Sequence, residues 1–156
     1  AELINGQGGQ VIEQYRHFVL SDKSKKAFKA MINVLLDPGN APNIQHCRGG
    51  KDRTGYGALL ILSMLGVSEQ DIIADYMLTG ANRLARNNVK MTAYRQITDN
   101  QDVLDYLLTL IDTREAFIVE TLNTMKALSG SVNAYIKNEL GFTDADFIKM
   151  QENYLQ

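Results

Sequence analysis

The sequence predicts an α/β fold in which helices dominate, on three observations. Apolar residues recur at helical spacing along most of the 156-residue chain, and residues typical of helix caps stand where several of these runs begin. A short strand is expected over residues 43–46, shortly after the turn-forming sequence Asp-Pro-Gly-Asn. Gly49 and Gly50 then predict a tight loop, and an apolar run follows at once. We therefore expect one domain over residues 1–156, with a strand, a loop and a buried helix at its centre.

Two helices are expected before this centre. Residues 1–10 contain three glycines and no periodic pattern, which is typical of a loop. Residues 11–20 have apolar positions at helical spacing and predict the first helix. Ser21 is a residue type favoured at helix N-caps, and the second helix is expected over residues 23–36.

The helix after the glycine loop is expected over residues 54–65. It is apolar on nearly all sides, so it should be central and buried. Gly66 is expected to end it, because glycine readily adopts the left-handed conformation that closes many helices. Ser68 then predicts the cap of another helix that runs to about Thr79, with Gly80 as its stop.

The remainder of the chain predicts four more helices. Residues 82–100 are polar and begin with a stretch rich in arginine and asparagine, and they are expected to follow the end of the preceding helix. Helical patterns resume afterwards, with Thr113 and Thr143 as expected caps. The expected helices cover residues 101–111, 114–128, 132–140 and 144–155.

Composition and charge exclude several classes of protein. With 45% hydrophobic residues the chain can bury a normal core, so it is not expected to be disordered. A net charge of −2 argues against a dedicated nucleic-acid binder. The longest apolar run, residues 58–67, is too short to cross a bilayer. One cysteine and two separated histidines make neither an internal disulfide nor a zinc site, so no metal or cofactor is expected.

Cys47 and Arg53 flank the glycine loop at the expected start of the buried helix. Free backbone N–H groups at a helix N-terminus and the positive end of the helix dipole favour a phosphate-sized dianion at that point. The same field favours the thiolate over the thiol, and the thiolate is the nucleophilic form of cysteine. The competing interpretation is a buried, inert cysteine, as most single cysteines are. The surrounding loop favours the reactive interpretation.

The ten residues from His46 to Gly55 read His-Cys-Arg-Gly-Gly-Lys-Asp-Arg-Thr-Gly. This stretch resembles the signature loop of the cysteine-dependent protein tyrosine phosphatases, and is most similar to that of bacterial tyrosine phosphatases that also act on phosphoinositides. The similarity covers most of the chain, although the loop alone is specific. The resemblance implies the helix-rich C-terminal part of a protein tyrosine phosphatase-like fold, with the signature loop between a short strand and a buried helix.

The resemblance also implies a role for each residue of the loop. Cys47 would attack phosphorus and form a phosphocysteine, and Arg53 would clamp the phosphoryl oxygens. Thr54 would donate its hydroxyl to the departing thiolate, cap the helix, or do both. Asp52 has three open roles, as proton donor, as partner of Lys51 or as structural acceptor. The implied phosphate-binding residues are Arg48, Gly49, Gly50, Lys51, Asp52 and Arg53, and the implied supporting residue is His46, which would orient the cysteine.

The chain departs from the resembled family in two ways. The family's general acid usually comes from a separate upstream loop, and no residue of 1–45 fills that role, because Asp22 and Asp37 are typical of a cap and a turn. The family also carries a sheet-forming portion before its signature loop, whereas residues 1–45 are mostly helical in pattern. We therefore expect the chain to lack an N-terminal sheet segment, and its apolar helix faces to bind that segment or a second copy of the chain.

A phosphotyrosine protein is the expected substrate, with phosphoinositides as a second option through the additional cation Lys51. Two other functions stay open. A phosphate-binding module without turnover would explain why no general acid is found. A sulfur-transfer or arsenate-reducing enzyme also uses a loop cysteine, but this chain has no second cysteine to resolve a redox step. The sequence does not distinguish a cytoplasmic from a secreted protein.

Three residues outside the loop have open roles. Arg83 and Arg86 would form either a rim for anionic substrates or a solvated basic loop. Tyr76 is expected to belong to the scaffold, as a hydrogen-bond brace.

Overall fold

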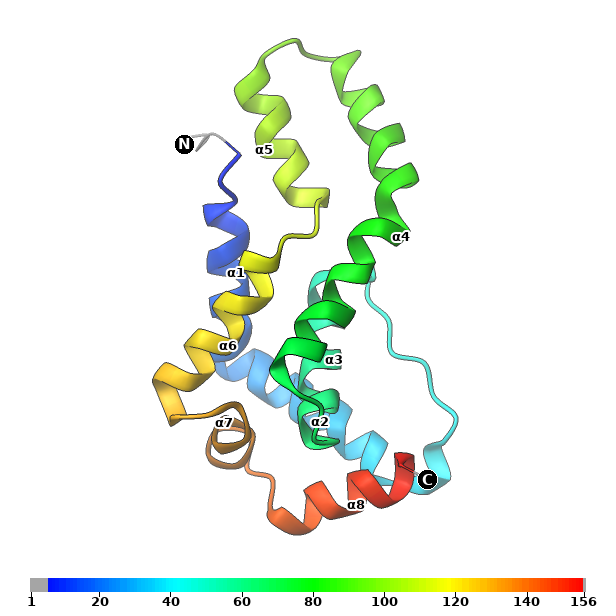
Figure 1. Ribbon diagram of the computed structural model, residues 1–156, viewed down its shortest axis with the longest axis vertical. Helices are drawn as coiled ribbons and strands as arrows, with labels where there is room; N and C mark the ends of the chain where they lie inside the picture. Colours follow the sequence, from blue (N-terminus) through cyan, green and yellow to red (C-terminus); the bar gives the residue numbers. More distant parts are fainter. Residues whose placement is uncertain (1–5, 156) are drawn as a thin grey trace.

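The computed structural model describes residues 6–155, which form eight α-helices and one short 3-10 helix (Figure 1). The helix-rich part of the predicted fold is therefore confirmed. None of the described helices is both long and apolar enough to cross a membrane. The elements are α1 (Gly9–Leu20), α2 (Asp22–Leu36), η1 (Pro38–Asn40), α3 (Asp52–Met64), α4 (Glu69–Arg95), α5 (Gln101–Ile111), α6 (Glu115–Ser129), α7 (Val132–Asn138) and α8 (Asp144–Tyr154).

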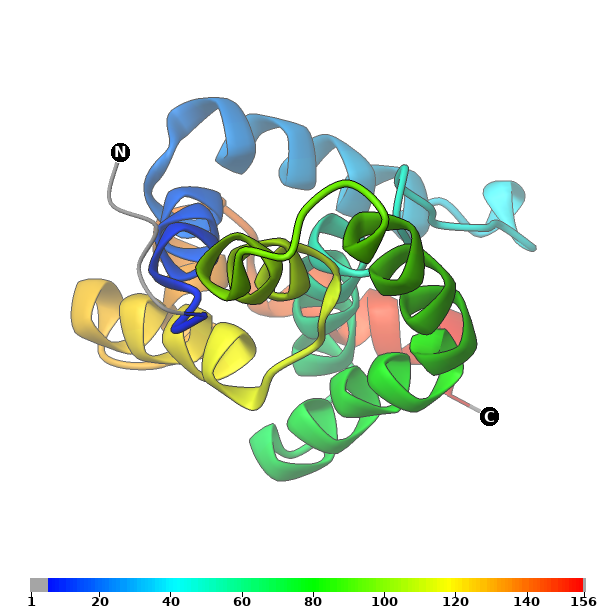
Figure 2. The same cartoon turned by 90° about the horizontal axis from the view of Figure 1, so that it is seen from above.

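Helix α3 lies at the centre of the body of the molecule, as its apolar sequence predicts. Its buried side chains include Tyr56, Leu59, Leu60 and Met64. Helices α4, α6, α7 and α8 all contact α3, and α1 packs along α6 (Figures 1 and 2). One apolar core joins these helices, so the N-terminus of α3 is held from several sides.

Helix α4 is longer than the sequence pattern predicts. A stop is expected at Gly80, but the helix continues for 27 residues to Arg95. A glycine inside a helix costs only about 1 kcal/mol, and α4 makes contacts with α5 and α6 that compensate for this cost. The second half of α4 forms a helical hairpin with α5 that projects from the body (Figure 1). This hairpin has a small core of its own, built on Met91, Leu104 and Ile111.

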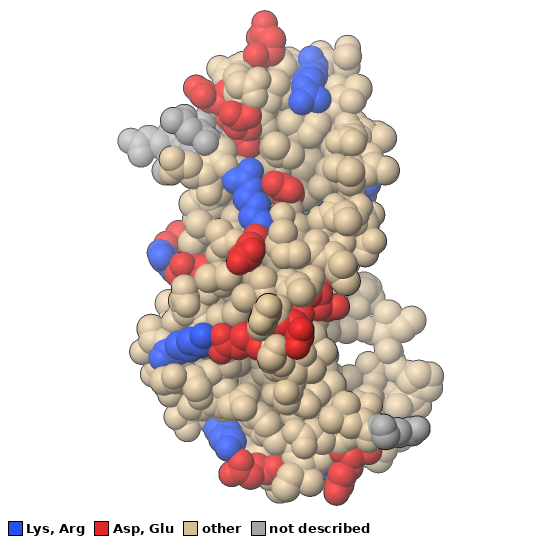
Figure 3. All heavy atoms as spheres, viewed as in Figure 1, with Lys and Arg blue, Asp and Glu red and all other residues tan. Residues whose placement is uncertain are grey.

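The strand expected over residues 43–46 is not formed in the described part of the chain. The segment is irregular and runs along the outside of the body between η1 and α3, and an opening in the molecular surface lies beside it (Figures 1 and 3). A strand is held by hydrogen bonds to a neighbouring strand, and residues 6–155 supply no such neighbour. The described residues are therefore all-α, and the strand of the α/β prediction has no partner among them.

Several predicted helix starts are confirmed where a side chain caps the helix, whereas Ser21 occupies the N-cap position of α2 without a capping hydrogen bond. Thr143 and Asp146 form a capping box at the start of α8. The Ser68 side chain caps α4 by accepting a backbone hydrogen bond. The prediction is wrong at α6, where Arg114 rather than Thr113 occupies the N-cap position and makes no capping hydrogen bond through its side chain.

Candidate active site

The glycine loop, residues 47–51, joins the irregular segment to the N-terminus of α3. Gly50 has a φ of 63°, a left-handed conformation that glycine adopts without the strain a side chain would add. From α4, Arg83 donates a hydrogen bond through Nη1 to the carbonyl oxygen of Gly49. Arg83, for which the sequence leaves two interpretations open, is therefore a half-buried support of this loop. Arg86 lies exposed on the same helix.

Cys47 is half-buried at the start of the loop. The Gly50 N–H donates a hydrogen bond to its Sγ at 3.2 Å. Burial, the largest single influence, raises the pKa of the thiol, but hydrogen bonds from the Thr54 hydroxyl and N–H and from the N–H groups of Gly49 and Gly50 together outweigh it. The pKa falls from the ordinary 9.0 to about 6, so the thiolate is the main form at neutral pH.

Thr54 lies in the first turn of α3, directly after Arg53. Its Oγ1 is buried and has no hydrogen bond of ordinary geometry within residues 6–155, so the hydroxyl lowers the pKa of Cys47 through a looser contact with the sulfur. The Thr54 carbonyl oxygen accepts a hydrogen bond from Gln45 Nε2 at 3.1 Å, which ties the irregular segment to α3. The contact of the Thr54 hydroxyl with the departing thiolate stays a prediction.

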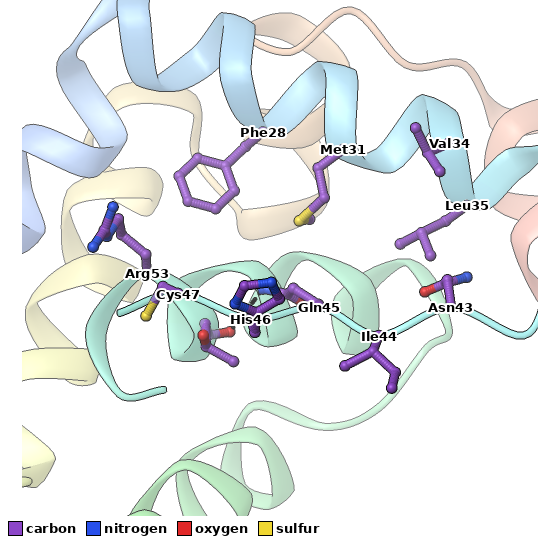
Figure 4. Close-up of a pocket in the computed structure, with 11 residues that line it drawn as sticks. Phe28, Met31, Val34, Leu35, Asn43, Ile44, Gln45, His46, Cys47 and Arg53 are labelled. Atoms are coloured by element: carbon purple, nitrogen blue, oxygen red, sulfur yellow. Dashed lines mark hydrogen bonds between the residues drawn. The ribbon is translucent and has the colours of Figure 1, made fainter. Parts of the chain in front are cut away.

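The predicted site residues Arg48, Arg53 and His46 are exposed. In Figure 4 the Arg53 side chain extends away from the sulfur of Cys47, on the side of Phe28. No acidic residue in the described part of the chain forms an ion pair with Arg53. Its guanidinium thus has no ion-pair partner among residues 6–155, and it must turn toward the loop to clamp a phosphoryl group. The orienting role of His46 stays a prediction, since no described residue is hydrogen-bonded to its side chain.

Lys51 and Asp52 face the core behind the loop. Lys51 is only 3% exposed, and its Nζ lies 2.8 Å from Asp52 Oδ1 and 5.6 Å from the centroid of the Phe117 ring. The contact with Asp52 is an ion pair by distance, although it lacks the alignment of a hydrogen bond. A buried ammonium group requires such a partner. The ammonium is therefore directed into the protein, and phosphate binding through Lys51 stays a prediction.

Tyr15 and Tyr76 complete a buried cluster behind the loop. Tyr15, on α1, donates its hydroxyl to Asp52 Oδ1 at 2.9 Å, and the Tyr76 hydroxyl, from α4, lies 2.7 Å from that of Tyr15. The helical spacing around Tyr15 predicts only that its ring faces the core. Its partners are 37 and 61 residues away in the sequence, so no local pattern could reveal them. The bracing role expected of Tyr76 is consistent with this contact.

A pocket of about 410 Å³ lies between α2, the irregular segment and the start of α3 (Figure 4). Cys47, Arg53 and Thr54 line it beside the loop. Its wall is mainly apolar and is formed by Phe28, Met31, Val34, Leu35 and Ile44. No group of three or more potential metal ligands occurs among the residues that the structure describes. The pocket therefore brings the Cys47 thiol and the Arg53 side chain together with an apolar wall.

Comparison with known proteins identifies the family. The profile of the tyrosine phosphatase family matches residues 5–156. A protein of Cupriavidus necator that bears the name of a tyrosine-protein phosphatase is 30% identical over 145 residues, which are 93% of this chain and 50% of that protein. The triple specificity protein phosphatase PtpB of Mycobacterium tuberculosis is 32% identical over 65 residues, which are 42% of this chain and 23% of that protein. The chain belongs to the tyrosine phosphatase family, and the resemblance seen in the signature loop is confirmed.

The chain spans half the length of the first of these relatives and about a quarter of the second. Both relatives are bacterial proteins. Family membership therefore establishes the class of protein, whereas the chemistry and the substrate have to be argued from the site itself.

Proposed function

We propose that this chain carries the nucleophile of a phosphatase that hydrolyses phosphate monoesters through a phosphocysteine intermediate. The observation that carries the proposal is the lowered pKa of Cys47, about 6, in a loop of N–H donors at the N-terminus of α3. An inert cysteine has no such set of donors around its sulfur. Membership of the tyrosine phosphatase family supports the same conclusion.

In the first step the thiolate of Cys47 attacks phosphorus in line with the leaving oxygen. The S–P bond forms as the P–O bond to the substrate breaks, and the oxygen leaves with that electron pair. The N–H groups of Gly49 and Gly50, and Arg53 once it has turned inward, stabilise the charge on the equatorial oxygens. In the second step water attacks phosphorus, a P–O bond forms as the S–P bond breaks, and the proton of the water passes to solvent. The sulfur departs with the electron pair as a thiolate, to which the Thr54 hydroxyl donates, and phosphate is released.

The contacts of Asp52 support one of its three predicted roles. Its Oδ1 accepts the Tyr15 hydroxyl and lies beside Lys51 Nζ. A carboxylate in these contacts acts as an acceptor, so we assign Asp52 to holding the loop rather than to protonating the leaving group. The leaving group then takes its proton from solvent or from an acid outside the loop. A phenol, with a pKa of about 10, depends on such help less than an aliphatic alcohol does.

Phosphotyrosine is the substrate that this site favours. Its ring would lie against the apolar wall of the pocket, where Phe28 and Met31 face the segment that leads to Cys47 (Figure 4). Its phenol oxygen is also the better leaving group. A phosphoinositide is the second substrate class, and its additional phosphates would require Lys51 to leave the core and turn outward.

We also propose that residues 1–156 belong to a single phosphatase domain in which residues 43–46 pair with a strand from elsewhere. The backbone N–H groups of this segment have no acceptor among residues 6–155, and Ile44 is 90% exposed. An exposed apolar side chain on unpaired backbone is typical of a sheet edge that a partner covers. That partner is either a sheet segment of the same domain or a second copy of the chain.

A phosphate-binding module without turnover is the second candidate function. It is favoured by the outward direction of Arg53 and by the contacts that engage Asp52. The experiment that separates the two is release of product from an aryl phosphate, from about pH 5 to about pH 8, by this chain and by Cys47→Ser. Turnover that rises as Cys47 ionises and is lost in Cys47→Ser supports the phosphatase. Phosphate binding without turnover supports the binding module, and the absence of both contradicts both.

A further inference from the structure

We propose that Tyr15 and Tyr76 are positioning residues of the signature loop. Their buried hydroxyls anchor Asp52, and through it Lys51, and so hold the loop N–H groups where an oxyanion binds. The inference rests on the proposed function of this loop and adds the residues that keep it in shape. Neither tyrosine lines the pocket at Cys47, so both act through the loop and not on the substrate.

The hydrogen bonds of this cluster all run toward Asp52, from Tyr76 to Tyr15 and from Tyr15 to the carboxylate. A tyrosine hydroxyl has a single proton, and Tyr15 donates it to Asp52 Oδ1 at 2.9 Å. The 2.7 Å contact between the two hydroxyls therefore has Tyr76 as its donor. Burial raises the pKa of both tyrosines above the ordinary value of 10.0, so both keep their protons at neutral pH. The result is a chain of donors from Tyr76 through Tyr15 to the loop.

Three helices converge on this chain of donors. Tyr15 comes from α1 and Tyr76 from α4, and the ring of Phe117 on α6 lies 5.8 Å from that of Tyr15, centroid to centroid. Lys51 Nζ is placed over the same Phe117 ring. On the other side, the Tyr76 ring packs so closely on Gly55 that a Cβ there would lie 2.8 Å from Tyr76 Cδ2. The Lys51–Asp52 end of the loop is thus enclosed by rings whose positions the core fixes.

Loss of the Tyr15 hydroxyl would leave Asp52 Oδ1 with Lys51 as its one remaining partner among the described residues. The loop also has room to move, because a cavity of about 90 Å³ between α3 and α4 is lined by Gly50, Thr54 and Tyr76. A shift into this cavity would take the N–H of Gly50 and the hydroxyl of Thr54 away from the sulfur. Both groups lower the pKa of Cys47, so its reactivity reports the position of the loop.

The test compares Tyr15→Phe with Tyr56→Phe. Tyr56 is a matched control, because it is equally buried and its hydroxyl also lies beside that of a second tyrosine, Tyr135, at 3.2 Å. Each variant loses one buried hydroxyl from the same core, but only the Tyr15 hydroxyl contacts Asp52. Cys47 is the single cysteine of the chain, so alkylation by iodoacetamide measures this site alone. The readouts are the pH midpoint of alkylation and the concentration of inorganic phosphate that halves its rate.

We expect Tyr15→Phe to move the alkylation midpoint upward and to raise the protecting phosphate concentration by about fivefold, the effect of one net hydrogen bond. Tyr56→Phe should leave both readouts unchanged, and Tyr76→Phe should have a smaller effect than Tyr15→Phe because the bond to Asp52 survives. Equal effects of Tyr15→Phe and Tyr56→Phe, or no effect of Tyr15→Phe, would overturn the inference.

Thermal unfolding identifies any variant that fails to fold. If Tyr15→Phe does not fold, the alkylation midpoint of Tyr76→Phe tests the inference in its place. A shifted midpoint for Tyr76→Phe supports the positioning role, and an unshifted one overturns it. Neither readout requires turnover. Failure to hydrolyse an aryl phosphate would therefore count against the proposed phosphatase and leave this test intact, because the alkylation midpoint needs only Cys47.

Discussion

Thr54 is the side chain that most strongly favours the ionised form of Cys47. Burial acts in the opposite direction, yet the hydroxyl and N–H of Thr54, with the loop N–H groups, bring the pKa of the thiol from 9.0 to about 6. Since the thiolate is the reactive form, alkylation should rise with pH through about 6 and level off above it. The lowered pKa also means that ionisation stabilises the fold fully above pH 9.0 and that this contribution is lost as the pH falls through about 6.

We expect Thr54→Val to move the alkylation midpoint of Cys47 from about 6 toward 9.0. Valine keeps the volume and the β-branch of threonine but removes the hydroxyl. A hydrogen bond to a charged group contributes about 2 kcal/mol, so alkylation near neutral pH should slow several-fold. Iodoacetamide rates measured across pH test this expectation.

The control for Thr54→Val is Thr121→Val on α6. Thr121 is also buried, and its hydroxyl donates to the carbonyl oxygen of Phe117 at 3.3 Å, without contact to the loop. Its replacement should leave the midpoint unchanged. If the two variants shift the midpoint alike, the hydroxyl of Thr54 is not what favours the thiolate.

At the scale of elements, Gly55 and Gly57 of α3 differ in how easily the neighbouring side chain could make room for an added Cβ. A Cβ at Gly55 would lie 2.8 Å from the buried ring of Tyr76, which the core and the Tyr15 hydroxyl hold in place. A Cβ at Gly57 would meet only the far end of the Gln45 side chain, which can swing away. We expect Gly55→Ala to lower the free energy of unfolding by about 1–3 kcal/mol.

Gly57→Ala should change the free energy of unfolding by less than about 1 kcal/mol, because improved helix propensity offsets the lost Gln45 hydrogen bond. Urea unfolding of both variants makes the comparison. A Gly55→Ala protein as stable as Gly57→Ala would show that α4 is free to move away from α3 at Tyr76.

At Gly80, in contrast to Gly55, we expect alanine to raise the free energy of unfolding. It lies inside the continuous α4, and a Cβ there would be 3.6 Å from Thr113 Cβ, an ordinary van der Waals distance. Gly80→Ala should therefore raise the free energy of unfolding by about 0.5–1 kcal/mol, as measured by urea unfolding. Gly130→Ala is the contrasting variant, because its φ of 86° is strained for alanine and should make it destabilising. A destabilising Gly80→Ala would mean that the helix needs glycine at this position.

These elements also indicate how far the sequence could predict the fold. Capping residues such as Ser68 and Thr143 act over a few residues, so the starts of α4 and α8 follow from local chemistry. The continuation of α4 through Gly80 depends on contacts with distant helices and leaves no local signal. The strand at 43–46 fails for a related reason, since a strand exists only beside another strand.

In the candidate site, too, local contacts could be predicted from the sequence and contacts with distant residues could not. The Cys47–Gly50 contact lies within a short loop, where the sequence predicts backbone N–H groups around the cysteine without naming the donor. The inward direction of Lys51 depends on Phe117, and the anchoring of Asp52 depends on Tyr15. Both partners are far away in the sequence, so the family resemblance implies phosphate contacts for two residues that the structure turns toward the core.

At the scale of the molecule, a well-packed helical body stands beside a segment with an unpaired backbone. Helix α3 is buried against α4, α6, α7 and α8, while residues 43–46 run along the outside with no acceptor for their N–H groups among residues 6–155. Hydrogen exchange measures this contrast directly, because an amide without an acceptor exchanges at close to the rate of an unfolded chain. In this chain alone we expect the amides of residues 43–46 to exchange fastest and those of α3 slowest.

The concentration dependence of this exchange tells the two proposed partners of the segment apart. If a second copy of the chain covers residues 43–46, their protection should grow with protein concentration, and Ile44→Lys should abolish it by placing a charge in the contact. If a sheet segment of the same domain covers them, exchange should stay fast at every concentration and slow only when that segment is present. Slow exchange at low concentration in this chain alone would contradict both, because it would require an acceptor within these 156 residues.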